Sequence, residues 1–344
     1  MVETEDFALP FKIPSDKKEW IPAMAIQSGF QLRSLINELK LFFNVKDLYD
    51  IVHEWRANRG ERHALATLVH VEGSSYRRPG ARMSICQTGQ RVGSLSAGCL
   101  EEEVVQRARD VLRTSEPALM TFDTRKRFGC AGTINIFIER ASDNFFADLA
   151  MQLDARRSCL AITRLAGENL GSRIVPFCNE PKREDEFVQQ IHPPIQLCII
   201  GDGLDSTPFH SLGQSLGWRT LEVTDAAQLA LVPDEWTAAV VKSHNYGRDF
   251  AALQKLLPLG LRYVGLIGPR KRRNQLLSDL LELGVTINAG FFAPAGLDLG
   301  AETPEEIALA IVSEIQRVFA AASGESLRER RTPIHGSITG MALT

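Results

Sequence analysis

Two cysteines lie in sequence settings that could give their thiols a chemical role. Cys99 occurs in the segment SLSAGCLE, just before an apolar stripe that predicts a helix and runs from Leu100 to Leu112. Unpaired N–H groups and the helix dipole stabilise a thiolate at such an end and lower the thiol pKa. Small neighbours such as Gly98 leave room for a bulky ligand. Glu101, in the predicted first turn, complements the dipole or accepts a proton from a bound group.

The second cysteine, Cys130, lies in the glycine-rich turn FGCAG, which leads into a predicted strand at Thr133–Glu139. A loop cysteine between glycines is less typical of a core position than Cys198, which lies inside an apolar run. Basic residues precede it at 125–127, and the turn GSSYRRPG contributes Ser75, Arg77 and Arg78. Such groups could hold an anionic ligand beside soft sulfur donors. Because a structural zinc site takes four ligands, the two thiols predict no protein-built metal site and favour a soft metal carried inside a cofactor.

A glycine-rich loop in the second half has the position of a dinucleotide-binding loop. The apolar run QLCII leads into GDGLDS, which contains Gly201 and Gly203, and a helix is predicted at Thr207–Leu216. Asp225 ends the next predicted strand, where a ribose-binding acid would lie. The two aspartates of the loop would repel a pyrophosphate if they pointed inward. The alternative is that the glycines only make a tight turn between strand and helix.

Three more residues follow predicted strands, at the sheet edge where α/β proteins bind ligands. His244 follows the run AAVVKS, and Gly268 and Arg270 follow the run YVGLI. Arg270 opens the cluster RKRR, which could bind a phosphate or form the solvated start of a helix. A lone histidine is more often structural than functional, so both interpretations stay open for His244.

The elements that must position these residues follow two patterns. In the first half a helix is predicted at Val45–Asn58, followed by strands at Ala64–Val71 and Ala81–Cys86. In the second half strands recur every 20 to 25 residues from Ile195, which indicates βαβ units and a parallel sheet, and Thr303 opens a last helix with a capping box. The predicted fold class is an N-terminal α/β domain followed by a Rossmann-like, doubly wound parallel-sheet domain. The predicted organisation is an extension at 1–44, a first domain at 45–178, a linker at 179–194, a second domain at 195–325 and a tail at 326–344.

Composition excludes several classes of protein. The 344 residues are 44% hydrophobic and 24% charged, with a net charge of -3, so no strong field attracts nucleic acid or an anionic membrane. No apolar run approaches the ~20 residues of a membrane helix. The acidic, proline-broken start lacks the pattern of a signal peptide, and the six cysteines form no CxxC pair. We therefore expect a cytoplasmic protein with free thiols and neither a nucleic-acid nor a membrane partner.

Together these motifs resemble those of the XdhC/CoxI family over roughly residues 45–320. The resemblance rests on GSSYRRPGARM, SAGCLEEEV and GCAG in the first half. In the second half it rests on IIGDG, the Ser243-His244…Asp249 pattern, YVGLIGPRKRR and PAGLDLGAETPEEIALAIVSEI. The motifs occur in the family's order and at its spacing.

The resemblance implies an accessory protein that matures molybdenum hydroxylases such as xanthine dehydrogenase, rather than a stand-alone enzyme. Such a factor binds the molybdenum cofactor (molybdopterin) transiently, supports its sulfuration with a cysteine desulfurase and delivers it to the apoenzyme, and we expect a homodimer. Cys99 and Cys130 match the family's cysteines, and Gly201 and Gly203 match its glycine loop. Departures at Ala131, at the run LDS after Gly203 and at Ala227 weaken the expectation of NAD(P) binding more than that of cofactor handling.

Two other functions are compatible with the sequence. An NAD(P)-dependent oxidoreductase built on the Rossmann-like domain would bind a dinucleotide tightly and lose that binding when Asp225 is changed. A nucleotide-sensing scaffold without chemistry would keep activating its client after Cys99→Ala or Cys130→Ala.

Overall fold

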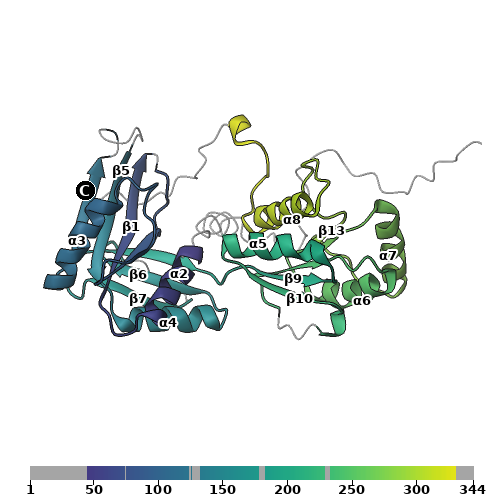
Figure 1. Cartoon of the computed structure of the whole chain (residues 1–344), viewed down its shortest axis with the longest axis horizontal. Coiled ribbons are helices and arrows are strands. Elements are labelled where there is room, and N and C mark those ends of the chain that lie inside the picture. Colours follow the sequence, from purple (N-terminus) through teal and green to yellow (C-terminus); the bar gives the residue numbers. More distant parts are fainter. Residues whose placement is uncertain are drawn as a thin grey trace, which may run out of the picture. The chain divides into compact units, whose positions relative to one another are not determined.

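The computed structural model describes residues 45–73, 75–123, 125, 132–177, 183–228 and 233–330 (Figure 1). The predicted extension at 1–44 and the part of the predicted tail beyond residue 330 lie outside these ranges.

The first half is built on a five-stranded antiparallel sheet, with the strand order β3-β2-β1-β5-β4. Its strands are β1 (His63–Gly73), β2 (Arg82–Cys86), β3 (Arg91–Gly93), β4 (Ala118–Asp123) and β5 (Gly132–Arg140). Helix α3 (Glu101–Thr114) covers one face, and its buried side chains are Glu101 and members of the predicted apolar stripe. Strands β1 and β2 confirm the two strands predicted at Ala64–Val71 and Ala81–Cys86, whereas β4 was not predicted.

A second layer covers the other face of this sheet. Helices α2 (Val45–Ala57) and α4 (Asp143–Asp154) share a core with Leu65 of β1 and with a three-stranded sheet of order β7-β6-β8. The strands of that sheet are β6 (Cys159–Arg164), β7 (Gly171–Pro176) and β8 (Glu186–Ile191). Alternate residues of β1 belong to the two cores, Leu65 to this one and Ala64 to the other, so β1 is an almost continuous apolar run.

Strand β8 corrects the predicted linker at 179–194. It pairs antiparallel with β6 along its whole length, so residues 186–191 belong to the fold of the first half. Its buried side chains include polar ones, and the buried Arg82 donates a hydrogen bond to Gln189. A strand whose inward positions are polar lacks the apolar alternation that identifies strands in sequence, and for this reason it resembled a charged linker.

The second half is a parallel five-stranded sheet of order β10-β9-β11-β12-β13, which confirms the predicted Rossmann-like fold. Its strands are β9 (Gln196–Ile200), β10 (Arg219–Val223), β11 (Thr237–Val241), β12 (Tyr263–Leu266) and β13 (Phe291–Phe292). Its helices are α5 (Thr207–Leu216), α6 (Tyr246–Leu256), α7 (Arg270–Glu282) and α8 (Pro304–Phe319). Helix α5 lies beside α8 on one face, and α6 lies beside α7 on the other (Figure 1).

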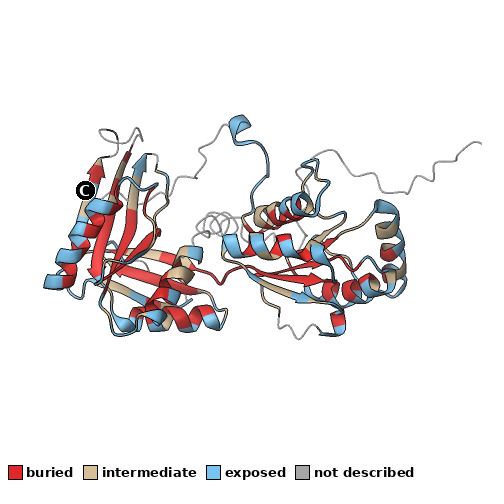
Figure 2. Cartoon of the chain, viewed as in Figure 1, coloured by how far each residue is buried: buried red, intermediate tan, exposed pale blue. Residues whose placement is uncertain are grey.

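Burial follows the sheets and the inward stripes of the helices (Figure 2). In the parallel sheet, Cys198 and Ile200 pack with α6 and α7, so the alternate residues of β9 face α5 and α8. None of the helices in the described parts of the chain combines the length and apolar character that crossing a bilayer requires.

Candidate functional site

The segment from Ser94 to Leu100, between β3 and α3, presents the Cys99 side chain to solvent. Leu95, Ser96 and Leu100 are buried, whereas Ala97, Gly98 and Cys99 are exposed. We call this segment the Cys99 loop. Leu100 is the N-cap of α3, so the thiol lies one residue ahead of the cap and not in the first helical turn. The predicted helix start is therefore correct to within two residues, and the sulfur is accessible.

Glu101 fixes the shape of the Cys99 loop. Its Oε1 accepts hydrogen bonds from the backbone N–H groups of Leu95 (3.2 Å) and Ser96 (2.8 Å). Its Oε2 accepts bonds from the Ser96 hydroxyl (2.6 Å) and the Leu100 N–H (3.1 Å). Burial raises the pKa of this carboxyl, but the hydrogen bonds from Ser96 and the backbone outweigh burial and lower the pKa below its usual value. The carboxylate predicted as a possible proton acceptor is thus buried and hydrogen-bonded to its own loop.

Further hydrogen bonds act within the Cys99 loop and connect it to its surroundings. The hydroxyl of Ser96 accepts hydrogen bonds from the Gly98 N–H (3.1 Å) and from the Cys99 thiol (3.5 Å). Arg77 donates to the Ser94 hydroxyl at 2.9 Å and pairs with Asp47 of α2. The basic turn GSSYRRPG therefore touches the start of the Cys99 loop, and two motifs predicted to act on one ligand are joined.

Of the other site residues predicted in the first half, the structure describes Ser75 and Arg78 but not Cys130. Ser75 and Arg78 are half-buried beside Arg77 in the basic turn. Burial and the nearby charge of Arg330 lower the pKa of Arg78. Cys130 lies outside the described residues. Gly132, two positions after it, lies opposite Gly73 in the register of β1 and β5, at the end of the sheet that leads into the basic turn.

In the second half, a buried lysine changes the electrostatics of the glycine-rich loop. Lys242 is fully buried at the end of β11, and its Nζ donates to Asp205 Oδ1 (2.7 Å) and to the backbone oxygen of Asp202 (3.2 Å). His244 Nε2 lies 3.6 Å from the other oxygen of Asp205. Burial is the largest single influence and raises the pKa of Asp205, but the hydrogen bond and charge of Lys242, together with the hydrogen bonds from His244 and the backbone, outweigh it, so the net shift is downward. The repulsion expected from this aspartate is therefore offset by a lysine that sequence reasoning missed.

The two glycines of this loop make a tight turn that no larger residue fits. A Cβ on Gly201, where φ is +136°, would lie 2.8 Å from the Lys242 carbonyl carbon. A Cβ on Gly203, where φ is +123°, would lie 2.8 Å from Asp205 Oδ1. The backbone that follows β11 thus leaves no space for a Cβ at position 201. At position 203 the inward-turned Asp205 side chain takes that space.

The other predicted residues of the second half gather at the carboxyl end of the parallel sheet. Asp225 accepts a hydrogen bond from the Ala227 N–H at 2.8 Å, and its side chain is exposed. His244 is also exposed, and Gly268 and Arg270 lie at the start of α7, where Arg270 faces solvent. Between them Ser243 donates to the fully buried Asp249 at 2.5 Å, which also pairs with Arg272. The Ser-His-Asp pattern is thus a buried hydrogen-bonded pair with an exposed histidine beside it.

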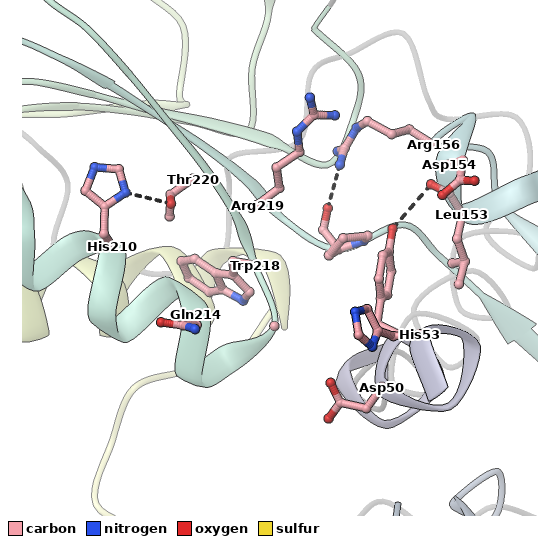
Figure 3. Close-up of a pocket in the computed structure, with 13 residues that line it drawn as sticks. Asp50, His53, Leu153, Asp154, Arg156, His210, Gln214, Trp218, Arg219 and Thr220 are labelled. Carbon is pink, nitrogen blue, oxygen red and sulfur yellow. Dashed lines mark hydrogen bonds between the residues drawn. The ribbon is translucent and has the colours of Figure 1, made fainter. Parts of the chain in front are cut away.

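A cavity of about 700 Å³ lies away from both the Cys99 loop and the glycine-rich loop (Figure 3). Tyr49 and His53 of α2, His210 of α5 and Arg219 of β10 are among the residues that line it. Tyr49 donates to the Leu153 carbonyl at 3.3 Å, and His210 contacts the Thr220 hydroxyl at 2.8 Å (Figure 3). Among the described residues, none of those predicted for the site from sequence lines this cavity.

Comparison with known proteins agrees with this architecture. The model of the XdhC and CoxI family matches residues 56–123, and that of the XdhC Rossmann domain matches residues 197–315. A Bacillus subtilis protein, named as a probable subunit of xanthine dehydrogenase, is 30% identical over 310 residues, covering 74% of this chain and 92% of the relative. The chain belongs to the XdhC and CoxI family.

Two further proteins are similar to this chain. The molybdenum cofactor insertion chaperone PaoD of Escherichia coli is 24% identical over 289 residues, covering 75% of this chain and 84% of PaoD. A crystal structure of a xanthine dehydrogenase from Bacillus halodurans has a TM-score of 0.68 at 22% identity, covering 83% of this chain and 98% of that one. At that identity the likeness concerns the fold.

Proposed function

We propose that this chain is an accessory factor that binds the molybdenum cofactor as cargo and inserts it into a molybdenum hydroxylase of the xanthine dehydrogenase type. The observation that carries the proposal is the exposed Cys99 thiol on a loop whose shape Glu101 and Arg77 fix. The similarity to PaoD, named a molybdenum cofactor insertion chaperone, supports it.

The chemistry of the Cys99 loop fits this cargo. Molybdenum held by the dithiolene of a pterin is a soft centre, and a thiol is a soft donor. Gly98 has φ +106° and open space where a Cβ would be, so the loop leaves room for a flat ring beside the sulfur. The cofactor also carries a phosphate, and Arg77 and Arg78 place positive charge on the turn that contacts the loop. In this proposal Cys99 binds near the metal, the two arginines face the phosphate, and Glu101 holds the loop.

Three finer features complete the proposal. Cys130 acts with Cys99, which is supported by the position of Gly132 at the end of β5 beside the basic turn. A cysteine desulfurase supplies the sulfur for cofactor sulfuration, and the apoenzyme receives the product. The factor works as a homodimer. It binds the cofactor more weakly than the apoenzyme does, because a carrier must release its cargo to its client.

The test is cofactor retention. The full chain is purified anaerobically from a host that makes the cofactor, and molybdenum and pterin are measured per chain. We expect Cys99→Ser to lose at least tenfold of both relative to wild type. Cys159→Ser is the matched control, because Cys159 is a buried thiol of the same half and should leave retention unchanged. Equal retention in wild type and Cys99→Ser would exclude the proposed role of this thiol.

A second candidate function is dinucleotide binding by the Rossmann half. The pairing of Asp205 with Lys242 favours it, because it offsets the negative charge that would oppose a pyrophosphate at the loop. Titration of the purified chain with NADH and NADPH tests it, with Asp225→Asn as the variant expected to weaken binding. No saturable binding of either nucleotide would exclude this function.

A further inference from the structure

Three buried side chains of metal-ligand type meet in the first half, away from the Cys99 loop. They are Glu54 of α2, His63 at the start of β1 and Cys86 at the end of β2, and their donor atoms all lie within 4.8 Å of one another. None of the three residues is more than 6% exposed. Strand β1 leads from His63 at this cluster to Gly73 next to the basic turn, so the cluster lies at the opposite end of the sheet from the proposed cofactor site.

The fold brings these residues together through strand register. His63 and Cys86 are direct partners in the antiparallel pair of β1 and β2. Side chains of such partners project from the same face, with Cβ atoms about 4.5–5.5 Å apart. Leu65, two residues after His63, shares a core with α2, so this is the face on which Glu54 lies. The His63 ring is held edge-on against Phe146, with ring centroids 5.6 Å apart.

The cluster contains buried polar atoms that the protein leaves unsatisfied. Neither Glu54 Oε2 nor His63 Nε2 has a hydrogen-bond partner. Asn58 donates to Glu54 Oε1 at 3.0 Å, and the free oxygen, Oε2, lies 3.4 Å from His63 Nδ1. A buried carboxylate oxygen without a partner is unfavourable, because it has given up its hydration and gained no hydrogen bond in return. A cation between these groups would supply the missing interaction.

A fourth candidate ligand, a carboxylate oxygen, lies next to the thiol. Cys86 Sγ contacts Glu61 Oε2, and Glu61 belongs to the turn between α2 and β1 and is partly exposed. The cluster therefore offers one sulfur, one imidazole nitrogen and two carboxylates within a short stretch of chain, on three elements that surround one point.

We propose that Glu54, His63 and Cys86 bind a Zn²⁺ ion, with Glu61 as the fourth ligand. Thiolate, imidazole and carboxylate together are typical of zinc, whereas Mg²⁺ and Ca²⁺ take oxygen ligands alone. When the Cys86 thiol loses its proton to solvent, the thiolate and the Glu54 and Glu61 carboxylates carry three negative charges, of which a divalent cation neutralises two, and Glu61 is the partly exposed member of the set. Four protein ligands leave no open position for substrate, so the ion is structural and joins α2 to the hairpin of β1 and β2.

This site is not visible in the sequence, because its spacing is not that of a zinc motif. The ligands occur at positions 54, 61, 63 and 86 and include a single cysteine, so no CxxC or HxxxH pattern marks them. Only the pairing of His63 with Cys86 reveals the cluster.

The test uses Co²⁺ as a spectroscopic substitute for Zn²⁺ in the full chain after removal of metals with a chelator. Wild type should bind one equivalent of Co²⁺ and show thiolate-to-metal charge transfer in the near ultraviolet, which Zn²⁺ abolishes on displacement. Cys86→Ser should lose the band, and the buried-thiol control Cys159→Ser should keep it. A wild type that binds neither ion, or a Cys86→Ser variant that keeps the band, overturns the proposal.

A second variant decides the matter if Cys86→Ser does not fold. Glu54→Gln keeps the size of the side chain and its contact with Asn58 but removes the charge. It should weaken Zn²⁺ binding at least tenfold while the far-ultraviolet circular dichroism stays that of wild type. Unchanged Zn²⁺ affinity in Glu54→Gln would also overturn the proposal. Molybdenum and pterin play no part in these measurements, so they test the site independently of the proposed function.

Discussion

At the scale of single residues, Glu101 shows how one buried carboxylate can hold the shape of the Cys99 loop. Four donors of the Cys99 loop and the helix start converge on its two oxygens. Hydrogen bonds to a charged acceptor contribute about 1.5–3 kcal/mol, and a glutamine would turn an N–H group toward some of the donors. We expect Glu101→Gln to lower the free energy of unfolding by about 2 kcal/mol, measured by urea denaturation at pH 7. The exposed neighbour Glu102 is the control, and Glu102→Gln should change the free energy of unfolding by less than about 0.5 kcal/mol.

The stability difference between wild type and Glu101→Gln depends on pH, because the folded protein shifts the pKa of Glu101. The folded protein lowers the Glu101 pKa below the ordinary value of 4.5, so the carboxylate stabilises the fold above that pH. Below it the unfolded chain takes up the proton first, and the stabilisation is lost as the pH falls through the folded-state pKa. The gap between wild type and Glu101→Gln should therefore be constant near neutrality and shrink below pH 4.5. A gap that stays constant down to pH 3 would contradict this account.

Residue types alone indicated part of the candidate site. Cys99 was identified from its small neighbours and the helix that follows, and the structure exposes it, because both signals are local in sequence. Lys242 was not identified, although a lysine directly after the apolar run AAVV is unusual enough to require a partner. Its partner Asp205 lies 37 positions earlier, and only the parallel pairing of β9 with β11 brings the two together.

At the scale of elements, helix α8 is specified by its own first turn. The Thr303 hydroxyl accepts from the Glu306 N–H, and Glu306 accepts in return from the Thr303 N–H at 3.0 Å, which confirms the predicted capping box. Removing such a cap is unfavourable by about 1 kcal/mol. We expect Thr303→Ala to lower the free energy of unfolding by about 1 kcal/mol in urea denaturation, and Thr303→Ser, which keeps the hydroxyl, to lie within about 0.5 kcal/mol of wild type. Equal stabilities of all three proteins would show that the packing of α8 alone determines it.

Elements whose evidence lies in neighbouring residues could be predicted from sequence, whereas elements that depend on contacts made after folding could not. Helix α5 has the predicted bounds, because its apolar spacing and Gly217 are both readable in the sequence. Strand β8 depends instead on Arg82, a buried cation that Gln189 can satisfy only after folding. Strand β4 alternates buried Ala118 and Phe122 with more exposed residues, a signal that was present but overlooked. Helix α4 has a serine N-cap at Ser142, another readable signal that was overlooked.

At the scale of the whole molecule, the described apolar clusters follow the two halves. One cluster joins α3 to the antiparallel sheet and another joins α2 and α4 to the same sheet, all within residues 48–191. The cluster of the parallel sheet with α6 and α7 draws on residues 198–293. Side chains that share a core unfold together, whereas separate cores need not. From this arrangement we propose that the predicted second domain at 195–325 is a unit with its own stability.

Calorimetry of the full chain should therefore show two unfolding transitions. Ile138 of β5 and Leu266 of β12 are both buried, at 0% and 1% exposure, and belong to different clusters. Replacing either residue with alanine leaves a cavity and destabilises its core by about 2–5 kcal/mol. We expect Ile138→Ala to move one transition and Leu266→Ala to move the other by several degrees, each leaving its counterpart in place. If both variants shift one shared transition equally, the two halves unfold as one cooperative unit, and the boundary near residue 195 does not separate independent domains.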